Sequence, residues 1–120
     1  MPRHSEFVNF ALEQLAALGA VRARAMFGGY GIYHGDIFFA ICVDDRLYLK
    51  ADAVTRSEFT ARGLSPFTYN ARGKTVTLQY YEVPPEVFED AQLMRQWAQQ
   101  AVGVALRASK PDSGPKKRRG

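Results

Sequence analysis

The sequence predicts an α+β domain, in which an antiparallel β-sheet of about five to six strands is flanked by an N-terminal helix, a middle helix and a long C-terminal helix. Apolar residues recur at helical spacing near both ends of the chain, whereas short apolar or alternating segments fill most of the middle. Tight turns join these segments, so hairpins rather than βαβ units should build the sheet. The 120 residues have the length of a single domain with a modest core.

The first helix is predicted to run from a cap at Ser5 to a stop at Gly19. Its apolar stripe consists of Phe7, Ala11, Leu15 and Leu18. Strands are expected at residues 21–26 and 30–34, with a turn at Gly35 and Asp36 before the next strand.

The segment 37–43 is apolar at every position, which predicts a central strand that is covered on both faces. A turn at Asp44 and Asp45 leads to a strand over residues 46–50. This strand alternates between apolar and polar residues, and the alternation places Tyr48 on the outward face.

A middle helix is predicted over residues 51–62, with Asp52 as its N-cap. A second hairpin should pair residues 67–69 with residues 75–81 through a loop at residues 70–74. In that hairpin the apolar residues at alternating positions of the second strand are expected to share one face. They are Val76, Leu78 and Tyr80.

The C-terminal helix should begin after Asp90, because an aspartate there can cap it and the preceding Pro84 and Pro85 stop the last strand. Its core stripe is predicted to be Leu93, Trp97, Ala101, Val104 and Ala105. The domain is expected to cover residues 1–108, and residues 109–120 are predicted to form a disordered basic tail.

The net charge of +4 is unevenly distributed along the chain. Residues 107–120 contain six basic residues and one acidic residue, whereas residues 1–106 contain ten basic and eleven acidic residues. The tail, with Lys116, Lys117, Arg118 and Arg119, can therefore attract a polyanion, or it can be a solvated solubility tail.

Composition predicts a cytoplasmic protein without a metal or a cofactor. No apolar segment approaches the ~20 residues that span a bilayer, no signal peptide is recognisable, and no membrane contact is expected. Cys42 is the only cysteine, so an intramolecular disulfide and a cysteine metal cage are excluded, and its apolar surroundings indicate a buried thiol. His4 and His34 lack ligand partners at metal-binding spacing.

Glycines at 28, 29 and 31, beside Phe27, form the most unusual motif of the chain. A phosphate-binding loop would need a helix to follow, but a strand is expected here. The motif is therefore interpreted as structural, because Gly28 and Gly29 permit a positive φ or a close backbone approach in a bend or bulge, and Gly31 can leave room for a crossing helix.

No catalytic arrangement is recognisable, and the chain is predicted not to be an enzyme. Carboxylates at Asp36, Asp44, Asp45 and Glu82 are available for acid–base chemistry, but the sequence does not bring any two of them together in a cleft. No Ser-His-Asp or Cys-His arrangement accompanies them.

Exposed tyrosines are the candidate interaction surface, and they comprise Tyr48, Tyr69 and Tyr81. Two interpretations remain open. The tyrosines can be covered by a helix or by a second copy of the chain, with a homodimer favoured. Alternatively they stack nucleobases while nearby bases contact phosphates. The candidate nucleic-acid-binding residues are Arg22, Arg24, Arg72, Lys74, Lys116, Lys117, Arg118 and Arg119, and Arg46 and Lys50 lie near them in the expected sheet.

Several motifs together resemble the TfoX N-terminal domain family. They are residues 26–40 (MFGGYGIYHGDIFFA), 45–50 (DRLYLK), 67–69 (FTY) and 80–84 (YYEVP), and the resemblance covers residues 5–108. It implies an α+β fold and a bacterial regulatory module without a catalytic set.

Competence regulators of the TfoX type resemble this domain followed by a second, helical domain, and they act with transcription machinery on DNA-uptake genes. Here a short basic tail is expected instead. The first hypothesis is therefore a homodimeric interaction domain that assists transcriptional regulation together with a regulatory protein partner. The second is direct, weak binding of nucleic acid, including DNA.

Overall fold

The computed structural model describes residues 6–26 and 28–109. Predictions for Ser5, Phe27 and the tail beyond Ser109 lie outside these residues. The helical elements are α1 (Glu6–Leu15), the 3₁₀ helix η1 (Ala16–Leu18), α2 (Arg56–Thr60), the 3₁₀ helix η2 (Pro85–Glu89) and α3 (Ala91–Ser109). The strands are β1 (Val21–Met26), β2 (Gly29–His34), β3 (Ile37–Val43), β4 (Arg46–Lys50), β5 (Pro66–Ala71) and β6 (Lys74–Glu82).

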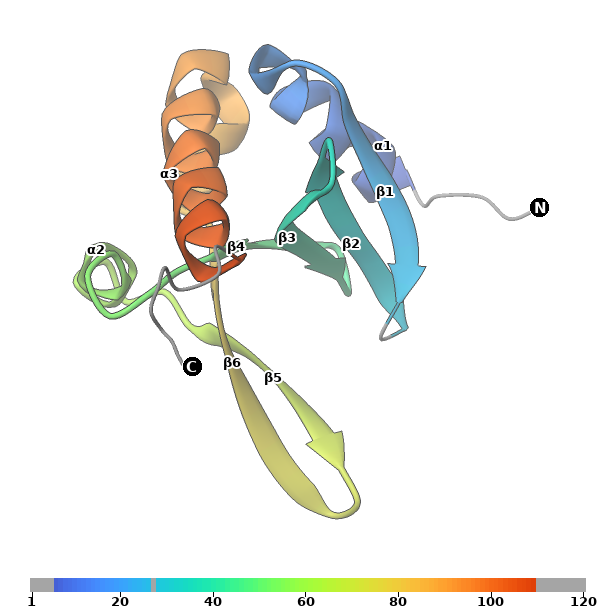
Figure 1. The fold of residues 1–120 in the computed structure, drawn as a ribbon, viewed down its shortest axis with the longest axis vertical. Helices are drawn as coiled ribbons and strands as arrows, with labels where there is room; N and C mark the ends of the chain where they lie inside the picture. Colours follow the sequence, from blue (N-terminus) through green and yellow to red (C-terminus); the bar gives the residue numbers. More distant parts are fainter. Residues whose placement is uncertain (1–5, 27, 110–120) are drawn as a thin grey trace, which may run out of the picture.

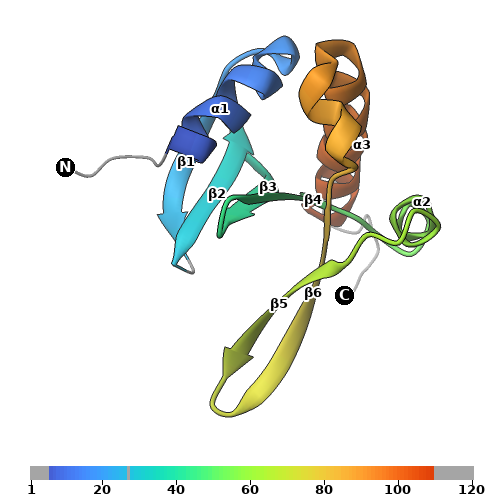
Figure 2. The same cartoon turned by 180° about the vertical axis from the view of Figure 1, so that it is seen from behind.

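The six strands form one antiparallel sheet in the order β1-β2-β3-β4-β6-β5 (Figure 1). The α+β prediction is confirmed, including the N-terminal, middle and long C-terminal helices. Helices α1 and α3 lie on the same side of the sheet, and the β5–β6 hairpin projects away from them (Figures 1 and 2). The sheet therefore has one face that these helices cover and one face that they do not.

The main core fills the space between the sheet and helices α1 and α3. Leu15 and Met94 are completely buried there, against Leu47 and Leu49 of β4. Burial of such side chains stabilises the fold by about 1.5–3 kcal/mol each. The central strand β3 is buried over its middle four residues, as its uninterrupted apolar sequence predicts.

A β-bulge in β3 adds one residue to the helix side of the sheet. The pairing changes from Ile32 opposite Ala40 to Tyr33 opposite Phe38, so Phe39 has no partner on β2. Phe39 and Ala40 both belong to the helix-side core and are both completely buried. The bulge therefore supplies a second consecutive core residue that strict alternation would place on the opposite face.

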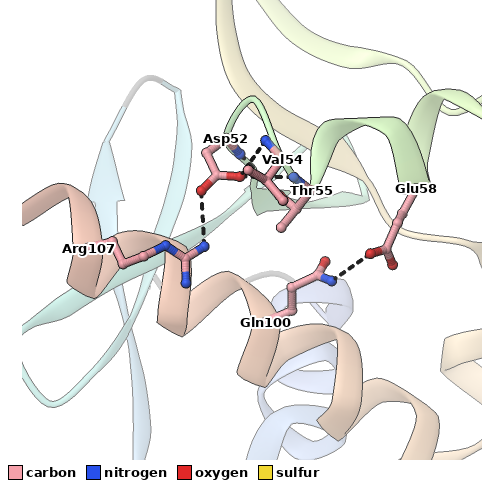
Figure 3. Close-up of polar contacts among 6 residues, drawn as sticks. All are labelled: Asp52, Val54, Thr55, Glu58, Gln100 and Arg107. Atoms are coloured by element: carbon pink, nitrogen blue, oxygen red, sulfur yellow. Dashed lines mark hydrogen bonds and ion pairs between the residues drawn. The ribbon is translucent and has the colours of Figure 1, made fainter.

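The middle helix is shorter than predicted, because Asp52 starts a turn and not the helix itself. Its Oδ1 accepts hydrogen bonds from the backbone N–H groups of Val54 and Thr55, at 3.0 and 2.9 Å, and α2 begins only at Arg56 (Figure 3). The buried Phe59 ring packs edge-on against Trp97 of α3, with ring centroids 5.0 Å apart. This contact compensates for the few apolar residues of the segment.

Two polar contacts also connect α3 to the α2 region (Figure 3). The Arg107 Nη2 donates to Asp52 Oδ2 at 3.0 Å, and the Gln100 Nε2 donates to Glu58 Oε2 at 3.3 Å. The hydrogen bonds of Asp52 with the backbone of Thr55 and with Arg107 lower the pKa of this carboxyl group to about 2.

The second hairpin is longer and its loop is tighter than predicted. The ladder continues to Ala71 opposite Lys74, so Arg72 and Gly73 alone form the turn, with φ values of 55° and 80°. Two consecutive positive φ values match the twist of the flanking strands, and glycine adopts them without steric cost. The five-residue loop that the sequence suggested is thus a two-residue turn.

Each described glycine of the motif has a different place in the fold. Gly28 has a φ of 76°, whereas Gly29 has an ordinary φ and lies so close to β3 that a Cβ would overlap the Cys42 carbonyl oxygen. No helix crosses Gly31, contrary to the sequence-based expectation. The side chains of Met26 and Phe38 occupy that space, 2.7–2.8 Å from where a Cβ would be.

Candidate functional site

The candidate site is the sheet face opposite α1 and α3, which we call the open face. Strand register defines it, because Ile41 is paired with Tyr48, and Tyr48 with Glu82, across β3, β4 and β6. Ile41, Phe67 and Tyr80 form a second, smaller core on this face, and Phe38, Val43, Tyr48 and Leu78 pack against it. No residue of a described helix belongs to that cluster, but Ala105 and Ala108 near the end of α3 line a hollow at its border with Phe38, Lys50 and Tyr80.

Aromatic rings follow one another across the open face. Tyr33 stacks on Phe38 with centroids 5.2 Å apart, and Phe38 lies 5.6 Å from Tyr80. Nearer the hairpin, Phe67 lies 5.4 Å from Tyr48 and 6.0 Å from Tyr69. The open face therefore carries two groups of aromatic rings, and Phe67 and Tyr80 belong with Ile41 to one buried cluster between them.

Basic side chains accompany these rings. The Arg22 guanidinium lies over Tyr33 at 4.8 Å from the ring centroid, and the Lys50 ammonium lies over Tyr80 at 4.9 Å. Such cation–π contacts hold a charge beside an apolar surface without neutralising it. Arg24 shares the face because it is paired with Gly31, which is itself paired with Ile41.

The charge of the open face is strongly positive. By strand register the bases on its strands are Arg22, Arg24, Arg46, Lys50 and Lys74. The acid on its strands is Glu82, and Asp36 of the adjacent turn lies 3.9 Å from Arg22. Glu82 is already paired, since Arg46 donates to its Oε1 at 3.1 Å. Because residues 1–106 contain more acids than bases, this surface concentrates positive charge that the domain as a whole lacks.

The structure places the predicted site residues in three locations. Arg22 and Arg24 are exposed on β1, at one end of the open face. Arg72 and Lys74 are exposed at the tip of the β5–β6 hairpin. Lys116, Lys117, Arg118 and Arg119 lie outside the described residues, so the structure does not relate them to either group.

The predicted tyrosine surface is only partly correct. Tyr48 and Tyr69 lie on the open face, where Tyr48 is half-buried and Tyr69 is 37% exposed. Tyr81 is on the opposite face, buried among the helices, and stacks on Phe59 at 5.4 Å. Its predicted outward orientation is wrong. Tyr81 shares a face of β6 with the polar residues Thr77 and Gln79, but at this end of the strand that face meets the helix-side core.

Sequence reasoning did not assign Tyr33, Phe38, Phe67 or Tyr80 to this surface. Tyr33 and Phe38 are paired across the turn at Gly35. Their positions on either side of this turn were a sequence signal that the two rings could meet. Phe67 and Tyr80 lie on the paired strands β5 and β6. They join Tyr48 and Lys50 only because β4 pairs with the distant β6, and no local pattern reports that pairing. Burial raises the pKa of Tyr80 to about 12, so its phenol is neutral at physiological pH.

The other candidate groups do not form a chemical site in the described residues. The region contains no cluster of three or more His, Cys, Asp or Glu side chains that could hold a metal ion. His34 Nδ1 lies 3.2 Å from the Ala20 carbonyl oxygen, and Asp36 lies 3.9 Å from Arg22. No helix of residues 6–26 and 28–109 is long and apolar enough to cross a membrane.

The glycine motif borders a hollow of about 490 Å³, but the chemistry of this hollow does not suit a phosphate group. Gly28 and Gly29 line it together with Asp44 and Asp45, whose carboxylates would repel an anion. No helix N-terminus follows the glycines, because β2 begins at Gly29.

Comparison with known proteins identifies the family. Residues 13–105 match the model of the TfoX N-terminal domain. This chain belongs to that family. It is 34% identical over 94 residues to the DNA transformation protein TfoX of Haemophilus influenzae. The matched region covers 77% of this chain and 42% of that relative.

Two other TfoX-type relatives show similar coverage. Protein Sxy of Escherichia coli is 30% identical over 95 residues, or 79% of this chain and 46% of that protein. The DNA transformation protein TfoX1 of Aliivibrio fischeri is 31% identical over 83 residues, or 69% of this chain and 37% of its own length. The chain thus spans less than half the length of the curated relatives it matches.

Proposed function

We propose that this chain is a non-catalytic regulatory domain of the TfoX type, which takes part in DNA transformation by binding nucleic acid through its open face. The observation that carries the proposal is the charge of that face, whose five bases outnumber Glu82, paired with Arg46, and Asp36 of the adjacent turn, 3.9 Å from Arg22. The phosphate groups of nucleic acid bind to basic protein surfaces of this kind. Each phosphate contact releases counterions from the nucleic acid, which favours binding.

Ring-bound cations support this proposal. Arg22 and Lys50 are held over tyrosine rings, so less conformational entropy is lost when they contact phosphates. Phosphate contacts supply affinity without reading sequence. The open face therefore acts as a positioning surface, and recognition of particular sites in DNA requires further groups.

A homodimer is the second candidate, and the half-buried Tyr48 beside Phe67 favours it, because aromatic rings are enriched at protein interfaces. Two-fold symmetry would nevertheless bring the same basic surface of both copies together. Like charges at close range oppose such a contact, so we rank this candidate below nucleic acid.

Fluorescence anisotropy with labelled duplex DNA at several salt concentrations tests the proposal. The full chain is used with Lys116, Lys117, Arg118 and Arg119 all replaced by Gln, which removes the charge of the tail. Double substitution of Arg22 and Arg24 by Gln should reduce the slope of log K against log salt by about 2, because each phosphate contact contributes ~0.9.

A matched control removes two charges from the helices. Arg56 and Arg95 are exposed on α2 and α3, and replacing both by Gln should leave the slope unchanged. Failure of the tail-neutralised chain to bind DNA at low salt would overturn the proposal. Light scattering at tens of micromolar then tests the second candidate, which a monomeric mass would contradict.

A further inference from the structure

The free part of the β5–β6 hairpin, which we call the arm, is a two-stranded ribbon that extends beyond the rest of the sheet (Figures 1 and 2). Its paired residues run from Thr68 opposite Thr77 to Ala71 opposite Lys74. Strand β4 pairs with β6 only at Tyr80, Tyr81 and Glu82, so in the arm each strand has only the other as its neighbour.

The composition of the arm is unusual for an exposed hairpin. No acidic residue occurs between Glu58 and Glu82, whereas Arg72 and Lys74 are exposed at the tip. Polar uncharged side chains cover the exposed positions along both strands. They are Thr68, Asn70, Thr75, Thr77 and Gln79. The arm therefore offers hydrogen-bonding groups and positive charge, with no carboxylate to repel phosphates.

The length of the arm exceeds the depth of the major groove of B-DNA. Four paired positions at a rise of about 3.3 Å per residue give a ribbon of about 13 Å. The major groove is about 12 Å wide and about 8.5 Å deep, and it admits a two-stranded β-ribbon. The arm is long enough to place its tip against the base edges.

We propose that the arm inserts into the major groove of duplex DNA, with Arg72 directed at base edges and Lys74 at phosphates. This inference rests on the proposed function, because the open face would hold the flanking DNA backbone. An arginine at such a position can donate two hydrogen bonds to guanine O6 and N7, and an asparagine can pair with adenine.

Two local features prepare the arm for this role. The turn at Arg72 and Gly73 fixes the direction of the tip, because both residues adopt the left-handed conformation of a two-residue hairpin turn. The Thr75 hydroxyl donates to Asn70 Oδ1 at 3.3 Å, which orients the Asn70 amide and leaves its nitrogen as a donor. Both features lower the entropy that binding would cost.

The test compares two double variants of the tail-neutralised full chain. The first carries Arg72→Asn and Lys74→Gln, in which asparagine retains the turn because it tolerates a positive φ. The control carries Arg56→Gln and Arg95→Gln, which removes the same charge from the helices. We expect the arm variant to bind duplex DNA about tenfold or more weakly, while the control binds as the parent does.

Groove-specific competitors provide the second measurement. Methyl green occupies the major groove and netropsin occupies the minor groove. Methyl green should displace the parent chain, and netropsin should not. Displacement by netropsin alone, or an arm variant that binds as tightly as the control, would overturn the inference.

The two proposals fail in different ways. Absence of DNA binding by the tail-neutralised chain overturns the proposed function and the arm inference together. Salt-dependent DNA binding that requires Arg22 and Arg24 but not Arg72 and Lys74 overturns the arm inference alone. Tighter binding to a single strand than to the duplex also overturns it, because a single strand has no major groove.

Discussion

The absence of a side chain at Gly29 lets strand β2 pack closely against strand β3. The Gly29 Cα lies against the backbone of β3, where an added Cβ would overlap the Cys42 carbonyl oxygen and lie 2.7 Å from Val43 Cγ2. A backbone carbonyl in a central strand cannot move aside without disturbing the ladder. The demand for glycine here is thus steric, and it does not come from a positive φ.

Replacement of Gly29 by Ala should lower the free energy of unfolding by about 3 kcal/mol. This is the upper end of the usual cost of overpacking, which is about 1–3 kcal/mol. Gly103→Ala is the control, because a Cβ there would lie at an ordinary distance of 3.6 Å from Arg107 Nη1. That variant should gain about 0.5–1 kcal/mol from helix propensity. Urea unfolding measures the stability of both variants. A Gly29→Ala variant as stable as the Gly103→Ala variant would contradict the steric explanation.

Cys42 is a core residue whose chemistry follows from burial. Burial and the nearby Asp45 charge raise the pKa of the Cys42 thiol to about 12. The thiolate is the nucleophile, so at neutral pH the thiol should react with Ellman's reagent only when the protein unfolds. Rapid labelling of the native chain at pH 7 would contradict this prediction, and labelling in denaturant supplies the control.

At the scale of elements, the Asp52–Arg107 contact connects the end of α3 to the turn before α2. The pKa of Asp52 in the folded protein, about 2, is below the 3.8 that is ordinary for an aspartate. A lowered pKa means that the carboxylate stabilises the fold above pH 4 and that this stabilisation is lost as the pH falls from about 4 to 2.

The Asp52→Asn variant should therefore melt at a lower temperature than the parent at pH 7, and the difference should shrink as the pH approaches 2. Arg107→Gln removes the same ion pair from the other side and should reproduce part of the effect. Thermal unfolding followed by circular dichroism between pH 2 and 7 measures it. A difference in melting temperature that stays constant over this range would contradict the assigned role of the carboxylate.

Most elements could be predicted from the sequence because their signals are local. Turn residues separate β2 from β3, Asp90 caps α3 through hydrogen bonds to the Gln92 and Leu93 backbone N–H groups, and β3 is apolar throughout. The middle helix was predicted too long, because Asp52 caps a turn. A capping residue alone does not specify how many residues later a helix begins.

At the scale of the whole molecule, the candidate site depended on information that local patterns do not contain. The apolar face of β6, with Leu78 and Tyr80, belongs to the open face, whereas the mostly polar face carries Tyr81 into the helix-side core. Alternation along β6 therefore pointed to the wrong side for Tyr81. The pairing of β4 with β6 determines which face each of the two tyrosines occupies. It also brings Lys50 to Tyr80. The basic residues of the open face were visible in the sequence, but their gathering on one face was not.

The isolation of the arm from the core also has a consequence for hydrogen exchange. Amides of β3 are surrounded by other strands and by the helix-side core, so they should exchange only through global unfolding. Amides between Thr68 and Thr77 are protected by a single ladder in contact with water and should exchange by local opening, many times faster. Such opening is confined to the arm, so the rest of the domain keeps its full stability while the arm opens and closes.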